Sequence, residues 1–260
     1  EIWMKNENMS PLRYYTLMQS KKLSEKIKNE KIIVDFAMRY GNPSIKSKMK
    51  KLHQEGCENI IVLPLYPQYA AATTATVCDE VYRTLMRMRW QPALQIIPHY
   101  ESEPLYIDAL VNSLNKKISQ INWTPDLILA SYHGIPKKYF DNGDPYHCYC
   151  QKTSRLLSEK FNKIPIKTTF QSRFGPQEWL KPYTDKTLEN LPKEGKKNIL
   201  VICPGFSSDC VETLEEISMQ GKKSFLDGGG DNFDLVPCLN YNEDHINLIQ
   251  HLVKKYLVEK

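Results

Sequence analysis

Three carboxylates follow a short apolar run at a spacing that could serve chemistry. Asp209, Glu212 and Glu216 stand at i, i+3 and i+7, after a predicted buried strand at 199–202 and a turn at 204–205. In a helix these positions share one face. Ligands of open α/β sheets bind at the carboxyl ends of the strands, so a row of carboxylates there could accept protons or receive a cation.

The same spacing also has a purely structural explanation. Asp209 and Glu212 match a capping box, and the helix dipole favours acidic residues in a first turn. Most such pairs do no more than start a helix. The acidic stretch therefore indicates chemistry only if a second reactive group faces it.

His133 is a candidate for that second group. It follows a predicted strand at 127–131, and Gly134 and Pro136 favour an ordered loop that exposes the imidazole. A histidine at such a position is more often a hydrogen-bonded structural residue than a catalyst. His133 and Glu212 gain weight together, because both follow strands in the same half of the chain and could face one cleft.

The elements that must position these groups alternate along the chain. We predict strands at 31–38, 59–65, 94–98, 127–131, 166–170, 199–203 and 233–237, with helical patterns between them. Such alternation favours parallel sheets covered by helices on both faces. The predicted fold class is therefore α/β, with two similar doubly wound, Rossmann-like lobes and an active-site cleft between them.

The domain boundaries follow from a restart of this series near 122–125. We place the first lobe at 1–123 and the second lobe, with the histidine and the acidic helix, at 124–240. A C-terminal helix is expected at 241–260.

The composition is typical of a soluble globular protein. Of the 260 residues, 41% are hydrophobic and 25% are charged, and the net charge of +5 comes from scattered lysines, so nucleic acid is not indicated. No run approaches the ~18 apolar residues of a membrane span. The seven cysteines are odd in number and widely spread, which favours reduced thiols in the cytoplasm over a disulfide framework.

Motifs along nearly the whole chain resemble those of the ferrochelatases. The second half carries Ser-Tyr-His-Gly-Ile-Pro at 131–136, Gly-Asp-Pro-Tyr at 143–146, Phe-Gln-Ser-Arg-Phe-Gly-Pro at 170–176 and Ser-Asp-Cys-Val-Glu-Thr-Leu-Glu-Glu at 208–216. The first half carries Met-Arg-Tyr at 38–40 and Tyr-Pro-Gln-Tyr at 66–69, which resemble segments that line the family's porphyrin pocket. Each motif alone is weak, whereas their common order makes a strong joint signal.

The resemblance implies a chelatase-type fold and the last step of haem biosynthesis, in which ferrous iron enters protoporphyrin IX to form protohaem and two protons are released. His133 would take a pyrrole proton or hold the incoming metal, and Glu212 would face it across the ring as the second metal contact. Asp209 and Glu216 would continue the row outward as a relay for protons or metal. The sequence leaves open whether His133 is base or ligand.

The resemblance also implies residues that hold the porphyrin. Arg39 would pair with a propionate, for which a planar guanidinium is suited. Tyr40, Tyr69 and Trp179 would offer flat apolar surface to the macrocycle, with a place in the core as the alternative. Two further polar residues, Gln171 and Ser172, would lie in the pocket or in its polar network.

We expect no tightly bound cofactor, with ferrous iron as substrate. Some ferrochelatases carry an iron–sulfur cluster, which needs four thiolates or equivalents. Cys148 and Cys150 supply two, and the other cysteines would have to converge from separate elements, so we expect reduced thiols instead. The expected partners are protoporphyrin IX and ferrous iron, without nucleic acid, for a cytoplasmic monomer or homodimer. Peripheral contact with the inner membrane stays open.

Other functions stay open on the same scaffold. The substrate could be another tetrapyrrole, such as coproporphyrin, or the metal could be cobalt. A different class is a non-catalytic carrier of tetrapyrrole or metal. The presence of both His133 and Glu212 argues against a carrier, because binding alone requires neither a base nor a proton exit.

The chain begins at Glu1 instead of a methionine, and the family's first strand and the helices after it have no counterpart in the sequence. We therefore expect a first lobe that is incomplete at its N-terminus and lacks part of the pocket wall. The sequence leaves the activity of a chain of this extent open.

Overall fold

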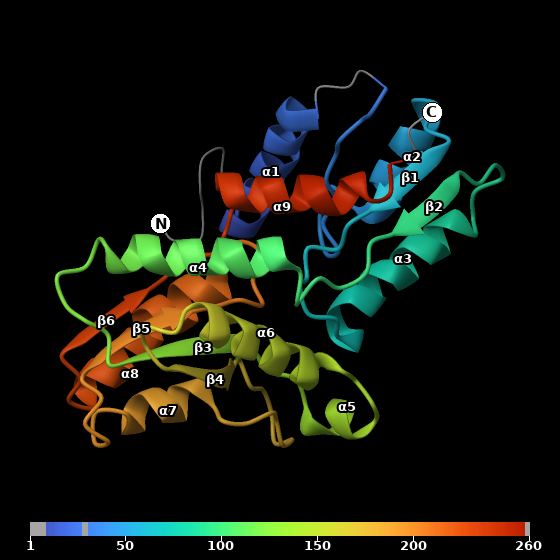
Figure 1. Ribbon diagram of the computed structural model, residues 1–260. Helices are drawn as coiled ribbons and strands as arrows, with labels where there is room; N and C mark the ends of the chain where they lie inside the picture. The colour runs from blue at the N-terminus through green and yellow to red at the C-terminus, as the bar shows by residue number, and fades with distance from the viewer. Residues whose placement is uncertain (1–8, 28–30, 258–260) are drawn as a thin grey trace.

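The computed structural model describes residues 9–27 and 31–257, which form two α/β lobes (Figure 1). The helices are α1 (Pro11–Ile27), α2 (Ile45–Gln54), α3 (Thr76–Leu85), α4 (Pro104–Ile118), α5 (Lys137–Asp141), α6 (Tyr146–Lys160), α7 (Thr184–Asn190), α8 (Lys222–Asp227) and α9 (Glu243–Lys254). The strands are β1 (Asn59–Val62), β2 (Ala93–Ile96), β3 (Leu127–His133), β4 (Ile166–Gln171), β5 (Asn198–Ile202) and β6 (Asn232–Leu235). Two π-helical segments, η2 (Ala71–Ala75) and η3 (Glu212–Gly221), lead into α3 and α8.

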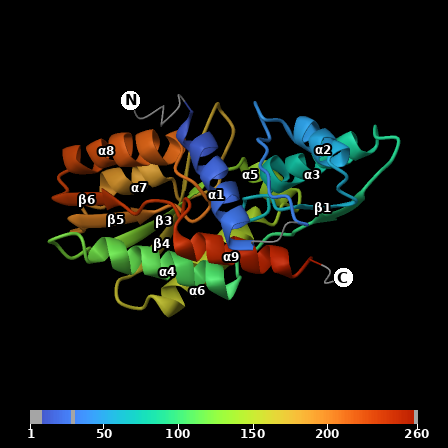
Figure 2. The same cartoon turned by 90° about the horizontal axis from the view of Figure 1, so that it is seen from above.

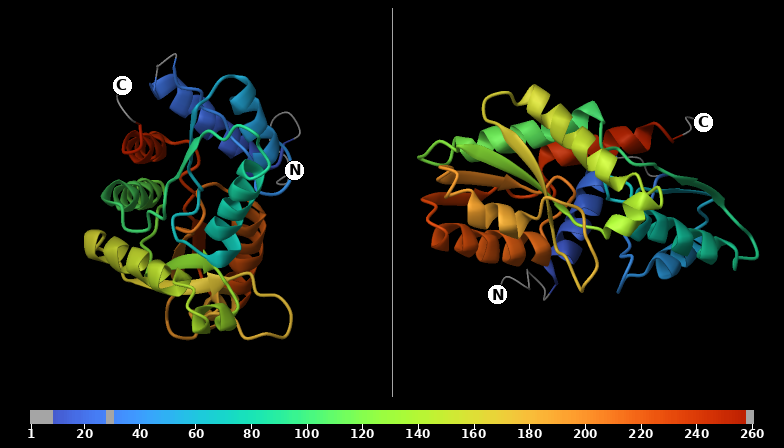
Figure 3. Two further views of the ribbon diagram at one scale, coloured as in Figure 1. Left: turned by 90° about the vertical axis from the view of Figure 1, so that its right-hand side faces the viewer. Right: turned by 90° about the horizontal axis from the view of Figure 1, so that it is seen from below.

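The second lobe contains a continuous sheet with strand order β4-β3-β5-β6, in which all neighbours are parallel. Ile128 and Leu200 pack against α4 and α6 on one face of this sheet. Leu129 and Val201 pack against α7, α8 and η3 on the other face. Figure 3 shows α6, α4 and α9 in a row along one flank of the molecule. The predicted doubly wound arrangement is confirmed for this lobe.

The first lobe contains a shorter parallel sheet. β1 and β2 pair from Asn59 with Ala93 to Val62 with Ile96, and α2 and α3 pack beside them. The predicted strand at 31–38 is wrong for the described chain, because residues 32–37 join no ladder there. A strand needs a neighbour for its N–H and C=O groups, and no strand among residues 9–27 and 31–257 pairs with this segment.

Two helices join the lobes. Figure 2 shows α1 and α9 between the two sheets. Leu23 of α1 packs with Ile246 and Ile249 of α9. α9 also packs against α4, which in turn buries Leu110 and Leu114 with the core of the second sheet. α4 lies within 1–123, the range predicted for the first lobe, but it packs on the second lobe.

Candidate active site

A cavity of about 1710 Å³ is lined by residues of both lobes. Of the predicted site residues, Arg39, His133 and Glu212 lie on its wall. The structure places the remaining ones off that wall, and these are Tyr40, Tyr69, Asp209, Gln171, Ser172, Trp179 and Glu216. The two predicted catalytic groups and the predicted propionate partner therefore share one cavity.

His133 is the last residue of β3, in register with Gln171 of β4. Its Nδ1 lies 2.7 Å from the carbonyl oxygen of Gly134. A carbonyl oxygen can only accept, so in the neutral ring Nδ1 carries the hydrogen and Nε2 keeps its lone pair. The Phe206 ring lies beside the imidazole, with 6.4 Å between the ring centroids. Nε2 is thus the nitrogen that can act as a base or as a metal ligand.

Close backbone contacts hold the loop that follows His133. The N–H of Gly134 donates to the carbonyl oxygen of Gln171 at 2.7 Å. A Cβ atom at Gly134 would come within 2.8 Å of that oxygen and 3.2 Å of the Trp179 ring, so the position requires glycine. Trp179 in turn donates from Nε1 to the carbonyl oxygen of Phe174 at 2.9 Å. Trp179, which is half-buried, therefore packs against the histidine loop.

The acidic helix starts later and winds differently from the predicted one. It is the π-helix η3, which begins at Glu212 with Val211 before it, so Asp209 does not cap it as the capping box predicted. A π-helix closes i→i+5 hydrogen bonds, so a face calculated for 3.6 residues per turn does not apply. Glu212 lies in the first turn and lines the cavity, and its carbonyl oxygen accepts from Nε2 of Gln171 at 3.0 Å.

Asp209 is an anchor between two segments. Its side chain is buried, and its Oδ2 accepts from Nδ2 of Asn240 at 2.7 Å. Its Oδ1 accepts from the N–H of Cys238 at 3.1 Å and from Oγ1 of Thr213 at 3.3 Å. These bonds tie the approach to η3 to the segment after β6, and both carboxylate oxygens are engaged.

Glu216 makes a second tie, between η3 and the end of β4. Its Oε1 accepts from the N–H of Ser172 at 2.7 Å, and its Oε2 accepts from the Ser172 hydroxyl. Ser172 has a φ of 59°, which is uncommon for a residue other than glycine. Contacts that over-determine such a backbone conformation hold it in place, and the Glu216 carboxylate supplies two of them.

Gln171 occupies the centre of a buried polar network. It is 4% exposed, and its Oε1 accepts from Oγ of Ser131 at 2.8 Å. Its Nε2 donates to the carbonyl oxygen of Glu212 and, at 3.4 Å, to Oε2 of Glu216. Gln171 thus connects the end of β3 to the first turn of η3, as the network alternative for this residue requires.

Arg39 is held from the first lobe by two contacts. Its Nε donates to the carbonyl oxygen of Thr76 at 2.8 Å, and its guanidinium carbon lies 4.5 Å from the centre of the Tyr40 ring. The two terminal nitrogens make no hydrogen bond with any residue that the structure describes, which leaves them for an anion. Tyr40 itself is 70% exposed. Tyr69 lies near Asp144, and burial followed by that carboxylate raises the pKa of the Tyr69 phenol.

Phe206 and Cys210 are among the residues of the cavity wall that sequence reasoning did not single out. Burial raises the pKa of the Cys210 thiol, and Glu212 adds to the rise. Burial also raises the pKa of the Tyr66 phenol, with Tyr40 adding to the rise and Arg39 opposing it. Phe206 could have been found from its place in the turn between the β5 strand and the acidic motif.

Polar bonds between the lobes fix the loops around the cavity. Nε2 of Gln68 donates to Oγ1 of Thr153 at 3.0 Å. Oγ of Ser207 donates to the carbonyl oxygen of Leu65 at 2.8 Å. Each bond joins the exit loop of β1 to the second lobe, so the two bonds hold this loop of the first lobe against the second lobe.

Within residues 9–27 and 31–257, no three His, Cys, Asp or Glu side chains gather into a group that could hold a metal ion. All seven cysteines are free thiols. Cys150 is buried, and burial raises its pKa well above the usual value, whereas Cys148 is exposed. In the same described ranges, no helix has the length and apolar character needed to cross a bilayer.

Known proteins match this chain along nearly its whole length. The ferrochelatase family model matches residues 1–257. The ferrochelatase of Rhizobium meliloti (strain 1021) is 54% identical over 259 residues, which cover 98% of this chain and 76% of that protein. The ferrochelatase of Brucella anthropi is 49% identical over 259 residues, which cover 98% of this chain and 74% of that protein.

Solved structures share the fold at much lower identity. SirB from Bacillus subtilis, determined with Fe3+, has a TM-score of 0.67 and 13% identity, with coverage of 95% of this chain and 91% of that chain. CbiX, the terminal enzyme for biosynthesis of sirohaem in denitrifying bacteria, has a TM-score of 0.64 and 11% identity, with coverage of 95% and 92%. These likenesses confirm the chelatase-type α/β fold. Together with the family match and the identities above, they lead to one conclusion: the chain belongs to the ferrochelatase family.

Proposed function

We propose that the chain inserts ferrous iron into protoporphyrin IX, forming protohaem in the last step of haem biosynthesis. The observation that supports the proposal is that the wall of one cavity includes both His133, at the end of β3, and Glu212, in the first turn of η3. Membership of the family supports this reaction class.

The reaction exchanges two pyrrole N–H protons for one divalent cation, so the charge of the ring is unchanged. The macrocycle hides its nitrogen lone pairs, and the metal must shed water before it enters. A site that holds a base and transient ligands in place lowers both barriers, because the groups need not reorganise during the reaction. The lone pair on Nε2 of His133 suits either task.

Glu212 supplies the second acceptor on the cavity wall. Its backbone is fixed by Gln171, so the carboxylate starts from a positioned first turn. In the proposal, Glu216 and Asp209 continue a relay for protons or metal. Such a relay requires Glu216 to exchange its Ser172 donors for water or metal, which distinguishes it from Glu212.

Arg39 orients the macrocycle in this proposal. The bond to Thr76 and the contact with the Tyr40 ring hold the guanidinium, while its terminal nitrogens can donate two parallel hydrogen bonds to a propionate. The proposal includes no resident cofactor, with iron as substrate only. It places the reaction in the cytoplasm, in a monomer or homodimer whose contact with the inner membrane can be measured by sedimentation with vesicles.

The test is anaerobic incubation with protoporphyrin and ferrous or zinc ions, followed by the loss of porphyrin fluorescence. His133→Ala and Glu212→Gln should bind porphyrin but metallate it at least ~100-fold more slowly, as expected for loss of a positioned acid–base group. Glu215→Gln, on the same helix but off the cavity wall, is the matched control and should behave as the wild type.

Three results would change the assignment. If the wild type binds porphyrin without metallating it, the carrier function applies. If coproporphyrin is metallated faster than protoporphyrin, the substrate is the other tetrapyrrole. If His133→Ala turns over like the wild type, the role given to His133 is wrong.

A further inference from the structure

Asp144 lies just before α6, and its two carboxylate oxygens bind backbone N–H groups of two different helical segments. Its Oδ1 accepts from the N–H of Tyr146, the first residue of α6, at 3.0 Å. Its Oδ2 accepts from the N–H of Ala71, the first residue of η2, at 2.8 Å. The first bond stays within the second lobe, whereas the second bond crosses to the first lobe.

The residues that precede these two segments cannot supply such bonds. They are Pro145 before α6 and Ala70 before η2, and neither side chain contains a hydrogen-bond acceptor. The first N–H groups of a helix have no partner within the helix, and the helix dipole favours a negative charge beside them. One carboxylate, that of Asp144, therefore stabilises the starts of two segments that belong to different lobes.

Backbone hydrogen bonds also join Asp144 to the loop that follows His133. The N–H of Asp144 donates to the carbonyl oxygen of Tyr139 at 3.0 Å. The N–H of Tyr139 donates to the carbonyl oxygen of Pro136 at 2.9 Å. These bonds hold Asp144 in a fixed position relative to the end of β3, where the proposed base lies.

The other end of η2 holds Arg39. Nε of Arg39 donates to the carbonyl oxygen of Thr76, the residue that directly follows η2, at 2.8 Å. The hydroxyl of Thr76 donates to the carbonyl oxygen of Thr73 at 2.8 Å, which keeps Thr76 in place on the helix. Because η2 is only five residues long, a shift of its first residue is passed on to Thr76 and from there to Arg39.

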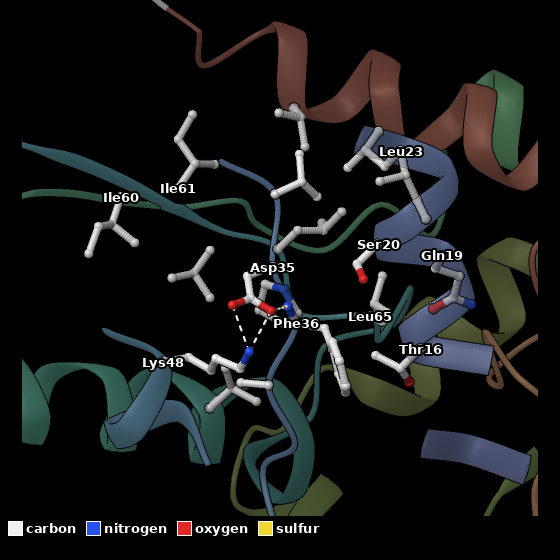
Figure 4. A pocket seen from close by; sticks show the side chains of 18 of the residues that line it. Thr16, Gln19, Ser20, Leu23, Asp35, Phe36, Lys48, Ile60, Ile61 and Leu65 are labelled. Carbon is white, nitrogen blue, oxygen red and sulfur yellow. Dashed lines mark hydrogen bonds and ion pairs between the residues drawn. The ribbon is translucent and has the colours of Figure 1, made fainter. Parts of the chain in front are cut away.

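A carboxylate close to Arg39 in sequence, that of Asp35, is engaged by a lysine. Its two oxygens lie 2.7 Å and 2.6 Å from Nζ of Lys48, and Figure 4 shows this pair among the residues that line the cavity. The terminal nitrogens of Arg39 make no hydrogen bond within the part of the chain that the structure describes. The guanidinium can therefore pair with an anionic group of the ligand.

We propose that Asp144 is a positioning residue for Arg39 and fixes where the guanidinium meets a carboxylate of the tetrapyrrole. The inference rests on the proposed pairing of Arg39 with a propionate. A bidentate pair of guanidinium and carboxylate depends on orientation as well as distance. A start of η2 that is free to move weakens this pair but leaves the apolar contacts of the ring in place. Asp144 is off the cavity wall and acts through η2.

The test compares protoporphyrin with its dimethyl ester, which has the same ring but no carboxylate. Dissociation constants are measured by fluorescence titration without metal. Asp144→Asn leaves one acceptor oxygen for two N–H groups, so it should weaken binding of protoporphyrin at least ~5-fold, as expected for a misplaced ion pair, and binding of the ester less than ~2-fold. The matched control is Asp141→Asn, which removes an exposed carboxylate of the same loop and should bind both like the wild type.

A proline at Ala71 removes the bond between the lobes and leaves the bond to Tyr146 intact. Proline has no N–H and is favoured at the first position of a helix. Ala70 has a φ of −143° and a ψ of 153°, the extended conformation that a residue before proline adopts. Ala71→Pro should weaken protoporphyrin binding and spare the ester, whereas Ala71→Ser keeps the N–H and should bind like the wild type. Ala71→Pro decides the question if Asp144→Asn does not fold.

Arg39→Ala shows through which group Asp144 acts. It should weaken protoporphyrin binding and spare the ester, and the addition of Asp144→Asn should cause no further loss. If the wild type binds the acid and the ester equally, the proposed pairing of Arg39 is wrong, and the inference loses its basis.

Three other results overturn the inference and leave that pairing intact, because the wild type still prefers the acid. In the first, Asp144→Asn and Ala71→Pro bind both porphyrins like the wild type. In the second, the two variants lose the acid and the ester equally, which is the result of a purely structural role. In the third, the fold-losses of Arg39→Ala and Asp144→Asn multiply in the double variant. Each readout is porphyrin binding, so it does not depend on metallation.

Discussion

The two lobes differ in how complete their sheets are. In the second lobe β3 lies between β4 and β5, and its residues from Leu127 to Tyr132 are buried. In the first lobe β1 has one neighbour, and 32–37 has none among the described residues. Two segments of similar apolar composition thus differ in pairing and burial, because burial of a strand depends on its neighbours more than on its own propensity.

The difference also separates two contributions to the cavity. The proposed reactive groups, His133 and Glu212, start from the finished sheet, where ties through Gln171, Ser172 and Glu216 fix them. The first lobe contributes Arg39 and an apolar wall. The lobe with the four-stranded sheet therefore carries the proposed reactive groups, and the lobe with the two-stranded sheet shapes the space for the substrate.

Amide exchange is the measurement with the largest expected contrast. Amides of 128–130 are bonded within the four-stranded sheet and should exchange only by global unfolding, whereas those of 32–37 lack ladder bonds. For the chain alone we expect exchange at 128–130 to be at least ~1,000-fold slower than at 32–37, as global and local opening differ by several kcal/mol. Equal protection would mean that the two lobes are equally closed.

Side-chain truncation should show the same contrast in stability. Leu200 is fully buried in the second sheet, so Leu200→Ala should lower the free energy of unfolding by about 2–5 kcal/mol. Ile33→Ala removes a side chain that is 46% exposed and should change it by no more than about 0.5 kcal/mol. Urea denaturation measures both. A large loss at Ile33 would show that the first lobe buries this run in solution.

His245 on α9 should make the junction between the lobes sensitive to pH. Burial lowers the pKa of His245 from its ordinary 6.5 to about 4, and its Nδ1 bonds to the Asn240 carbonyl oxygen. Between these values the unfolded chain takes a proton that the folded chain excludes. Above pH 6.5 the neutral His245 makes its full contribution to the free energy of unfolding. About 3 kcal/mol of this contribution is lost as the pH falls from 6.5 to 4.

The control for this prediction lies on the same helix. His245→Gln should flatten the dependence of the unfolding free energy on pH over that window, whereas His251→Gln, at a half-exposed position, should leave it unchanged. Urea denaturation at several pH values measures the slope. If the unfolding free energy of His245→Gln depends on pH as steeply as that of the wild type, the pH dependence belongs to other groups.

The smallest expected effect separates an anchor from a relay. Glu216→Gln keeps one acceptor oxygen for Ser172 but loses the charge, so the free energy of unfolding should fall by about 1 kcal/mol. Metallation should slow by less than ~10-fold, because the acid–base group at Glu212 remains. An unchanged metallation rate would leave Glu216 as an anchor only and would contradict its place in the proposed relay.

The sequence was sufficient for the alternation of strands and helices, because hydrophobic periodicity is a local property of each segment. It also placed His133 and Glu212 at strand ends that meet at one edge of a sheet, which follows from parallel pairing. Hydrophobic periodicity alone could not decide whether residues 31–38 form a paired strand. Its pairing depends on a neighbour, and local sequence carries no information on whether that neighbour is present.

The finer geometry of the site also depends on contacts that sequence does not reveal. The shared face of Asp209, Glu212 and Glu216 assumed 3.6 residues per turn, whereas η3 is a π-helix. The Gln171 motif indicated a site residue but not the direction of its amide. That direction is set by Ser131 and by η3, which are 40 or more residues away in the chain.

The central claim is that His133 and Glu212 act on the same ring in one cavity, and a double-mutant cycle tests it most directly. The measured quantity is the metallation rate of wild type, His133→Ala, Glu212→Gln and the double variant, with porphyrin binding checked in each. Groups that act as a unit lose their effect together, so the double variant should be no slower than the slower single variant. If the fold-reduction in metallation rate of the double variant equals the product of the two single fold-reductions, the claim is contradicted, since the two residues would then act independently.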